Sequence, residues 1–382
     1  MVVNKPPMGW NSWNTYAEKI DEALILESAR ALKESGLADA GYNYVVIDDC
    51  WALHERGKDG KLVPDPEKFP RGMKALAGEI HALGLKFGMY SCSGLMTCAR
   101  YPSSLDREWT DAQTFAEWGV DFLKYDYCYK PLNRRGEELY RAMQLALANS
   151  GREILLSACS WGADKTHEWI RSTGSGMWRS TGDIFDNWNS IKSLILQQMT
   201  ILPYGGRGCF NDMDMLVVGM NGKGNVGLGG CTEEEYRTHF GAWCMLQSPL
   251  MIGCDVRNMS EFTRSLLTNP MLLSIDQDPL CAQTFRLDAL TVDFDPNKQD
   301  CCILARMLEG GDIALGFFNL SDSVKNLHCT LNDMGLGVSS GMTLEMCDCF
   351  TGEKRSPICG TVSALGLQPH ACKVYRCKVV KA

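Results

Sequence analysis

The sequence contains only six histidines among 382 residues, no Cys-x-x-Cys pair and no excess of positive charge. Scattered histidines and unpaired cysteines do not provide the clustered ligands of a zinc site. The net charge of −8 argues against nucleic acid and anionic membrane as partners, because both bind basic surfaces. We therefore expect a protein that works without a metal or another cofactor.

No apolar stretch is long enough to cross a bilayer, and residues 1–7 contain no apolar core of a signal peptide. We therefore expect a cytoplasmic protein, whereas a leader removed before this sequence begins would indicate secretion. The 18 cysteines are numerous, and we interpret most of them as buried thiols in a reducing compartment.

A repeated unit of amphipathic helix, glycine and apolar strand covers the first two thirds of the chain. In one unit, Ile25, Ala29 and Leu32 share a helical face, Gly36 ends the helix, and the strand 44–47 follows. Eight such strand ends over roughly 280 residues predict a (β/α)8 TIM barrel. A doubly wound open sheet is the alternative, but no glycine-rich phosphate loop joins a predicted strand to a predicted helix.

Two patterns in this region predict where helices begin. Thr110-Asp111-Ala112-Gln113 and Thr232-Glu233-Glu234-Glu235 both have the spacing of a capping box. In that motif the first side chain and the fourth each satisfy a free backbone N–H of the other residue. We expect one barrel helix to start at each pattern.

The pattern of predicted elements changes after Asp276-Gln277-Asp278-Pro279. Short strand candidates follow from 290–294 to 373–379, separated by turn residues such as Gly310-Gly311. This pattern predicts an antiparallel β-sandwich domain. We place the barrel at 1–283 and the antiparallel domain at 284–382.

Two aspartates, Asp126 and Asp183, each end an apolar, strand-like run. Active sites of TIM barrels lie at the C-terminal ends of the strands, so both side chains are candidates for one cleft. Two such carboxylates can cleave a glycosidic bond with retention, one as nucleophile and one as acid/base. Lys124 points the same way as Asp126, where it keeps the carboxylate ionised or forms a purely structural ion pair.

Other interpretations of the acidic residues stay open. Asp183 needs a raised pKa to act as an acid, which we expect from desolvation by its apolar neighbours. Alternatively it caps a helix over 184–197, although Asp186 suits that position better. The pairs Asp48-Asp49 and Asp212-Met213-Asp214 match the metal ligands of a nucleotide-sugar transferase. A sugar-binding protein without catalysis is a further alternative.

Six motifs occur in a fixed order along the predicted barrel. They are Met8-Gly9-Trp10-Asn11-Ser12-Trp13, Ile47-Asp48-Asp49-Cys50-Trp51, Lys124-Tyr125-Asp126-Tyr127-Cys128, Cys159-Ser160-Trp161-Gly162, Trp178-Arg179-Ser180-Thr181-Gly182-Asp183-Ile184 and Asn211-Asp212-Met213-Asp214-Met215. Together they resemble glycoside hydrolase family 27, the α-galactosidases and α-N-acetylgalactosaminidases. The resemblance covers essentially the whole barrel, and it also implies a C-terminal β domain.

The resemblance implies an exo-acting, retaining α-galactosidase that releases terminal α-D-galactosyl residues from an oligosaccharide or glycoconjugate. In the family pattern Asp126 is the nucleophile and Asp183 the acid/base of a double displacement. The pattern implies substrate contacts by Trp13, Asp48, Asp49, Tyr90, Lys124, Ser160, Trp161, Arg179 and Asp214. It also implies a disulfide between Cys98 and Cys128, and a homo-oligomer is compatible with the sequence.

Two positions carry the expected sugar selectivity. The resemblance assigns Asp48 and Asp49 to the axial 4-hydroxyl and the 6-hydroxyl. Neighbours on a regular strand face opposite sides, so we expect the strand to end or bulge at this point. Ser160 stands where many family α-galactosidases carry a larger polar residue, often Glu. Together with Ala163 it leaves room at the 2-position, so α-N-acetylgalactosaminidase is the alternative activity.

Overall fold

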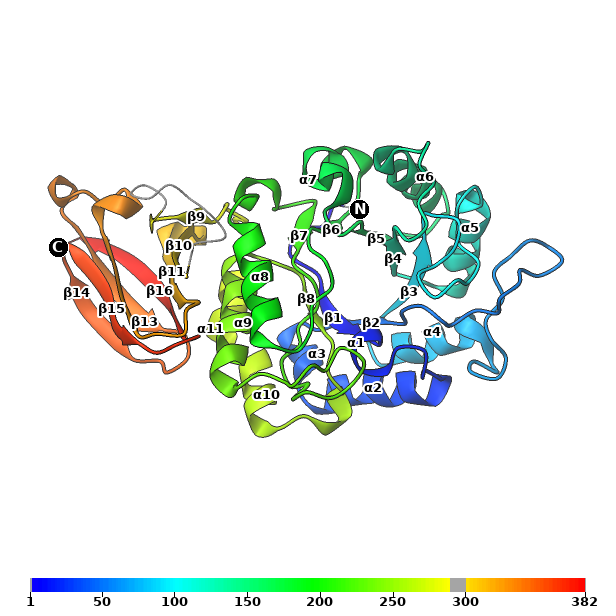
Figure 1. Ribbon diagram of the computed structural model, residues 1–382, viewed down its shortest axis with the longest axis horizontal. Helices are drawn as coiled ribbons and strands as arrows, with labels where there is room; N and C mark the ends of the chain where they lie inside the picture. The colour runs from blue at the N-terminus through cyan, green and yellow to red at the C-terminus, as the bar shows by residue number, and fades with distance from the viewer. Residues whose placement is uncertain (1, 289–299, 382) are drawn as a thin grey trace.

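The computed structural model describes residues 2–288 and 300–381, and its N-terminal part is built on one parallel sheet (Figure 1). The sheet has eight strands in the order β7-β6-β5-β4-β3-β2-β1-β8. The strands are β1 (Met8–Asn11), β2 (Tyr44–Val46), β3 (Lys86–Cys92), β4 (Phe122–Asp126), β5 (Leu155–Cys159), β6 (Met177–Arg179), β7 (Phe210–Asp212) and β8 (Leu250–Ile252). Parallel strands in chain order confirm the predicted TIM-barrel class and exclude the doubly wound alternative.

The barrel closes between β7 and β8 through a single residue beyond β7. The Leu216 N–H donates to the Met251 carbonyl at 2.7 Å, and the Gly253 N–H donates to the Leu216 carbonyl at 2.9 Å. Leu216 and Ile252 form an isolated parallel bridge. The chain that leaves β7 therefore stays at the rim of the barrel, where it carries Asp214 to the end of the sheet.

Helices surround the sheet and cover its outer face (Figure 1). Their apolar stripes pack on the strands, as in α2, where Ile25, Ala29 and Leu32 are fully buried. Within the described residues, no helix has both the length and the apolarity needed to cross a membrane. The helices are α1 (Trp13–Tyr16), α2 (Glu22–Glu34), α3 (Leu37–Ala40), α4 (Gly72–Ala82), α5 (Glu108–Trp118), α6 (Gly136–Ala148), α7 (Thr166–Trp169), α8 (Trp188–Gln198), α9 (Glu233–Met245), α10 (Glu261–Leu267) and α11 (Pro270–Asp276).

One predicted helix start is confirmed and one is wrong. Thr232 and Glu235 form the reciprocal capping box of α9. Thr110, in contrast, lies inside α5, which begins at Glu108 after Arg107 without any side-chain cap. The Thr114 hydroxyl donates to the Thr110 carbonyl at 2.8 Å, so this segment already has helical hydrogen bonding. The capping pattern alone therefore does not distinguish a helix start from a first turn.

The predicted helix over 184–197 also starts later than expected. Asn187 caps α8, and its side chain accepts the Ser190 N–H. Asp186 does not serve as the cap. Its buried carboxylate accepts the Tyr236 hydroxyl and the Gly222 N–H, at 2.9 and 2.7 Å. Asp186 thus fastens the glycine-rich loop after β7 to α9.

The C-terminal part is an antiparallel β domain, as the sequence predicts. One sheet has the order β14-β13-β16-β11-β10-β9, and β12 pairs with β15 in a second sheet. Between the two sheets, Leu315, Phe317, Leu327 and Val362 contribute to a separate core. The strands are β9 (Phe285–Arg286), β10 (Cys301–Met307), β11 (Ile313–Asn319), β12 (Lys325–Thr330), β13 (Met342–Asp348), β14 (Lys354–Ile358), β15 (Thr361–Leu367) and β16 (Cys372–Lys381). The predicted strand 290–294 lies outside the described residues.

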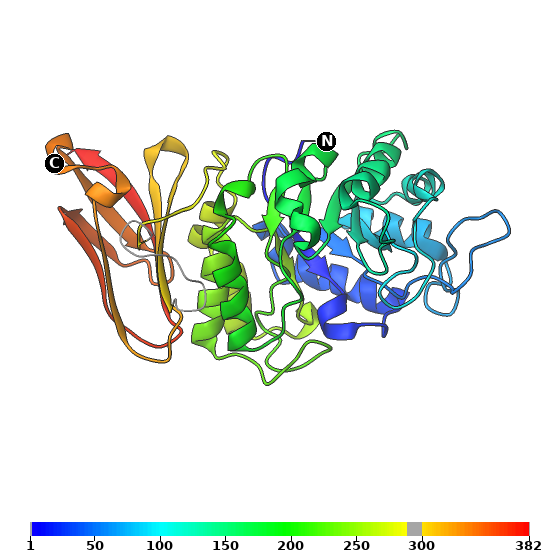
Figure 2. The same cartoon turned by 45° about the horizontal axis from the view of Figure 1, so that its top comes forward.

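The antiparallel domain packs on one side of the barrel, beside α8, α9 and α11 (Figures 1 and 2). Leu304, Phe318 and Val374 on its larger sheet belong to the same buried cluster as Trp243 of α9. The two parts of the chain therefore share a continuous apolar contact. Figure 2 shows the β domain at one end of the molecule.

Candidate active site

A pocket of about 420 Å3 lies at the C-terminal ends of the barrel strands. It brings together most of the residues singled out in the sequence. These are Trp13, Asp48, Asp49, Tyr90, Lys124, Asp126, Trp161, Arg179, Asp183 and Asp214, with Cys98 and Cys128 beside them. A larger groove of about 720 Å3 lies against the β domain, but Glu234 is its one carboxylate among the described residues. Of these two pockets, the barrel pocket is the one that offers a pair of carboxylates for glycosidic cleavage.

Asp126 ends β4, lines this pocket and is 5% exposed. Its Oδ1 atom accepts the Tyr127 N–H at 2.8 Å. Burial raises the pKa of Asp126 to about 6, while the charge of Lys124 and the Tyr127 N–H hold that pKa down. A buried carboxylate that is ionised near neutral pH is suited to act as a nucleophile.

Lys124 lies in the pocket with Asp126, but its ion pair is with Asp48. The Lys124 Nζ atom is 2.7 Å from Asp48 Oδ2, and the two side chains are 17% and 2% exposed. Burial disfavours the charged lysine, but the Asp48 carboxylate outweighs that effect and raises the pKa of Lys124. Lys124 therefore remains a cation that faces the nucleophile and supports Asp48 at the same time.

The backbone at Asp48 and Asp49 is irregular, as expected. Strand β2 ends at Val46, and Cys50 has a left-handed φ of 69°. Asp48 accepts the Asn11 side-chain amide at 2.7 Å, while Asp49 accepts the N–H groups of Cys50 and Ala99 at 2.7 and 2.9 Å. Both carboxylates line the pocket because the chain has already left the sheet. Burial raises the pKa of Asp49, and its two N–H donors oppose that shift.

Arg179 at the end of β6 links Asp183 to Asp214. The Nη2 atom of Arg179 is 2.8 Å from Asp183 Oδ1 and 2.7 Å from Asp214 Oδ2. Burial raises the pKa of Asp214 to about 7 against the opposing charge of Arg179. Asp214 reaches this place through a left-handed backbone with φ of 86° and also accepts the Ile184 N–H. The segment carrying Asp183 is thereby tied to the chain after β7.

The predicted desolvation of Asp183 is wrong. Its side chain is 65% exposed, and Ile184, although buried, does not cover it. Asp183 nevertheless lines the same pocket as Asp126. An exposed acid at the mouth of a pocket is positioned to exchange protons with solvent and with a leaving group.

The carboxylates proposed as metal ligands already have cationic or hydrogen-bonding partners. Asp48 binds Lys124, and Asp214 binds Arg179. Asp212 accepts the Asp214 N–H at 2.9 Å. Protein cations thus occupy the positions beside these oxygens, which disfavours the interpretation as a nucleotide-sugar transferase site.

Ser160 does not line the pocket, contrary to the prediction. Its side chain is fully buried, and its hydroxyl lies 2.6 Å from the Thr166 hydroxyl. Cys159, at the end of β5, faces the pocket, so the next side chain along the chain points away. Trp161 returns to the pocket through a left-handed backbone with φ of 57°. The geometric basis for a 2-position contact by Ser160 is therefore absent.

Tyr90 and Trp13 supply the aromatic walls of the pocket. Tyr90 is 1% exposed, and no described residue makes a hydrogen bond to its hydroxyl. Burial raises the pKa of Tyr90, so the phenol stays protonated and can donate to a bound molecule. The Lys124 Nζ atom lies 5.3 Å from the centre of the Tyr90 ring.

Sequence reasoning missed several lining residues, above all Asn225 and Val226. They lie in the glycine-rich loop after β7, which is held by a 3.1 Å hydrogen bond from the Val226 N–H to the Asn14 carbonyl. The stretch Gly222-Lys223-Gly224 indicates a tight loop, but it does not indicate which part of the barrel the loop packs against. The other missed residues are Asn14, Cys159, Phe185 and Met215.

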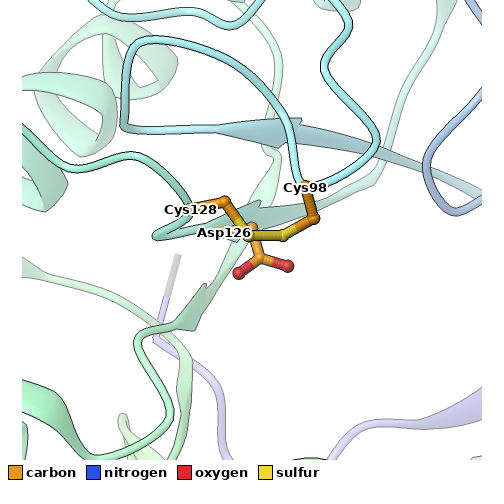
Figure 3. A group of neighbouring side chains, drawn as sticks. All are labelled: Cys98, Asp126 and Cys128. Carbon is orange, nitrogen blue, oxygen red and sulfur yellow. A yellow bond between two sulfur atoms is a disulfide. The ribbon is translucent and has the colours of Figure 1, made fainter.

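The structure joins Cys98 and Cys128 by a disulfide, with Cα atoms 5.2 Å apart. Cys98 lies in the loop after β3, and Cys128 lies two residues beyond Asp126. Figure 3 shows the bridge directly beside the Asp126 carboxylate. The bridge therefore fastens the loop after β3 to the strand end that carries the candidate nucleophile.

Several known proteins are similar to this chain in sequence and structure. Residues 5–278 match the melibiase family model described as "Alpha galactosidase A". An α-galactosidase of Cyamopsis tetragonoloba is 40% identical over 371 residues, which cover 97% of this chain and 85% of that protein. The structure of α-galactosidase I from Mortierella vinacea has a TM-score of 0.90 at 34% identity, covering 98% of this chain and 97% of that one. That of Saccharomyces cerevisiae α-galactosidase with raffinose has a TM-score of 0.88 at 27% identity, covering 99% and 98%. The chain belongs to the melibiase family of glycoside hydrolases, glycoside hydrolase family 27.

Proposed function

We propose that this protein is an exo-acting, retaining α-galactosidase, with Asp126 as nucleophile and Asp183 as acid/base. Membership of the melibiase family and the names of its relatives support the activity. One observation carries the assignment of roles: of the two carboxylates that line the pocket, Asp126 is 5% exposed and Asp183 is 65% exposed. Glycosidic cleavage with retention needs two carboxylates in different roles, one as nucleophile and one as acid/base.

The first chemical step forms a covalent galactosyl-enzyme. Asp126 Oδ2 attacks the anomeric carbon, because Oδ1 is held by the Tyr127 N–H. The bond from the anomeric carbon to the leaving oxygen breaks, and Asp183 gives its proton to that oxygen. In the second step Asp183 takes a proton from water, whose oxygen displaces Asp126 and restores the free carboxylate. Two inversions give net retention.

The remaining charged residues position the sugar for attack by Asp126. Asp48 and Asp49 present carboxylate oxygens that can accept the 4- and 6-hydroxyls, and Lys124 can donate to a neighbouring hydroxyl. Arg179 keeps Asp214 and Asp183 on one side of the pocket. Charge-assisted hydrogen bonds of this kind are stronger than neutral ones, so they can select galactose over glucose.

The proposed substrates are oligosaccharides or glycoconjugates that end in an α-D-galactosyl residue. Support comes from the related Saccharomyces cerevisiae structure, which contains raffinose. A cytoplasmic location also remains a proposal, supported by the 16 free cysteines among the described residues. A homo-oligomer remains compatible with the sequence.

A paired assay tests the activity. The purified protein is incubated with p-nitrophenyl α-galactoside and, separately, with the matching α-N-acetylgalactosaminide. We expect turnover of the galactoside. The Asp126→Ala variant should lose nearly all of that turnover, while its circular dichroism spectrum should show that the fold is retained. Preference for the N-acetylated sugar would instead support the alternative α-N-acetylgalactosaminidase. Hydrolysis of neither sugar would refute both activities.

A further inference from the structure

Three potential metal-ligand atoms meet in the pocket beside the end of β4. Cys98 Sγ, Cys128 Sγ and a carboxylate oxygen of Asp126 all lie within 4.8 Å of one another. Figure 3 shows the carboxylate beside the two sulfur atoms, which are joined in the disulfide. The bridge therefore keeps two thiols in an unreactive form next to the candidate nucleophile.

The bridge is accessible to a small reductant. Cys98 is exposed and Cys128 is half-buried, and both line the substrate pocket. A soluble dithiol can transfer two electrons and two protons to the disulfide, which becomes two thiols while the reductant becomes a disulfide. Since Cys98 and Cys128 come from separate loops, each sulfur can then rotate independently about its own Cα–Cβ bond.

The separation of the two cysteines suits a tetrahedral cation. Zn2+ binds thiolate sulfur at about 2.3 Å, which places two sulfurs of a tetrahedral site about 3.8 Å apart. The Cα atoms are 5.2 Å apart, so rotation of the side chains reaches that separation without a large backbone shift. Two thiolates, one carboxylate oxygen and one water complete four-coordination.

The third ligand is available, and the surroundings favour a cation. No described residue makes a hydrogen bond to Asp126 Oδ2, because the Tyr127 N–H engages Oδ1. Charged groups on the pocket wall comprise the five carboxylates Asp48, Asp49, Asp126, Asp183 and Asp214 against two cations, Lys124 and Arg179. An excess of carboxylates attracts a divalent cation, and the bound cation offsets the negative charge that two thiolates add.

We propose that reduction of the Cys98–Cys128 bridge creates a binding site for a thiophilic divalent cation, such as Zn2+ or Cd2+, and that its occupation blocks catalysis. The cation displaces the two thiol protons to solvent and binds both sulfurs and Asp126. Inhibition rests on the proposed function, since it requires Asp126 to be the nucleophile. Formation of the metal site does not depend on that role.

The experiment separates binding from activity. The full chain is reduced with dithiothreitol, freed of reductant without oxygen, and titrated with Cd2+ or Zn2+. We expect a thiolate-to-Cd2+ absorption band in the reduced protein in addition to any band that the other free cysteines give in the oxidised protein. At a Zn2+ concentration about ten times the dissociation constant, mass action predicts about a tenfold loss of α-galactoside hydrolysis. A chelator should restore the rate, and the oxidised protein should show neither effect.

Matched variants make the result decisive. Cys98→Ser/Cys128→Ser should lose both the band and the Zn2+ sensitivity, each judged against its own metal-free rate. Cys359→Ser removes an exposed free thiol in the β domain and should change neither. Absence of the additional band in the reduced wild type, or equal Zn2+ sensitivity in the double variant, overturns the inference. A band without inhibition overturns the block of catalysis.

Discussion

Replacing Lys124 with methionine is expected to lower stability and to shift the pH dependence of catalysis together. The change removes the ammonium 2.7 Å from Asp48, whose side chain is 2% exposed. Loss of one partner from a buried ion pair costs about 3–5 kcal/mol. Asp48 keeps its hydrogen bonds from Asn11 and from the Asp49 N–H, so we expect a cost near the lower value. Urea unfolding measures it.

The same change alters the nucleophile. Asp126 has a pKa of about 6, and Lys124 is the largest influence that lowers it. Since a protonated carboxylate cannot attack, kcat/KM falls as the pH drops through this value. An opposite charge nearby shifts a carboxylate pKa by about 1–3 units, and for two residues on one strand we take about one unit. The acidic limb of kcat/KM in Lys124→Met should therefore move upward by about one pH unit.

The control for this experiment is Lys86→Met. Lys86 begins β3 at the other end of the barrel, where its Nζ atom lies 5.0 Å from the Tyr44 ring centre. It should leave the acidic limb of kcat/KM unchanged. If Lys124→Met keeps the wild-type limb and the wild-type unfolding midpoint, the reasoning on Asp48 and Asp126 is refuted.

Three further outcomes follow from the same geometry. Asp183→Ala should lose activity on natural galactosides but keep more of it on nitrophenyl substrates, because a good leaving group needs little acid assistance; equal losses on both would contradict its role. Asp49→Ala should cost about 2–4 kcal/mol in kcat/KM through loss of a charged hydrogen bond, and α-glucosides hydrolysed at a comparable rate by the wild type would exclude the selection. Opening the Cys98–Cys128 bridge, whose cysteines are 30 residues apart, should lower the free energy of unfolding by about 3–4 kcal/mol, measured by urea unfolding of Cys98→Ser/Cys128→Ser.

The barrel was predictable because its signals are local. The apolar faces and strand ends repeat along the chain, and each strand end places its polar residue at one rim. Asp126 shows this directly, since it ends β4 as the sequence indicates. The reciprocal cap of Thr232 and Glu235 was equally visible because both partners lie within one turn.

The misplaced residues depend on contacts that no local pattern encodes. Ser160 follows a strand end whose last side chain, Cys159, faces the pocket, so Ser160 turns inward, where its hydroxyl pairs with that of Thr166. Asp183 stays exposed although its carboxylate pairs with Arg179, which also binds Asp214, a residue more than 30 positions away in sequence. Val226 enters the pocket through a loop tied to Asn14 at the other end of the barrel sequence. Long-range hydrogen bonds of this kind decide where a loop lies.

The identity of the nucleophile can be measured directly by trapping the covalent intermediate. A fluorinated galactosyl substrate with a good leaving group slows both steps, and breakdown of the intermediate most, so the sugar accumulates on the enzyme. Peptide mass spectrometry of the labelled protein should find one galactosyl adduct, on the peptide that contains Asp126, and Asp126→Ala should remain unlabelled. An adduct on a peptide without Asp126 would contradict the account. Initial release of β-galactose from the α-galactoside, observed by proton NMR, would also contradict the account.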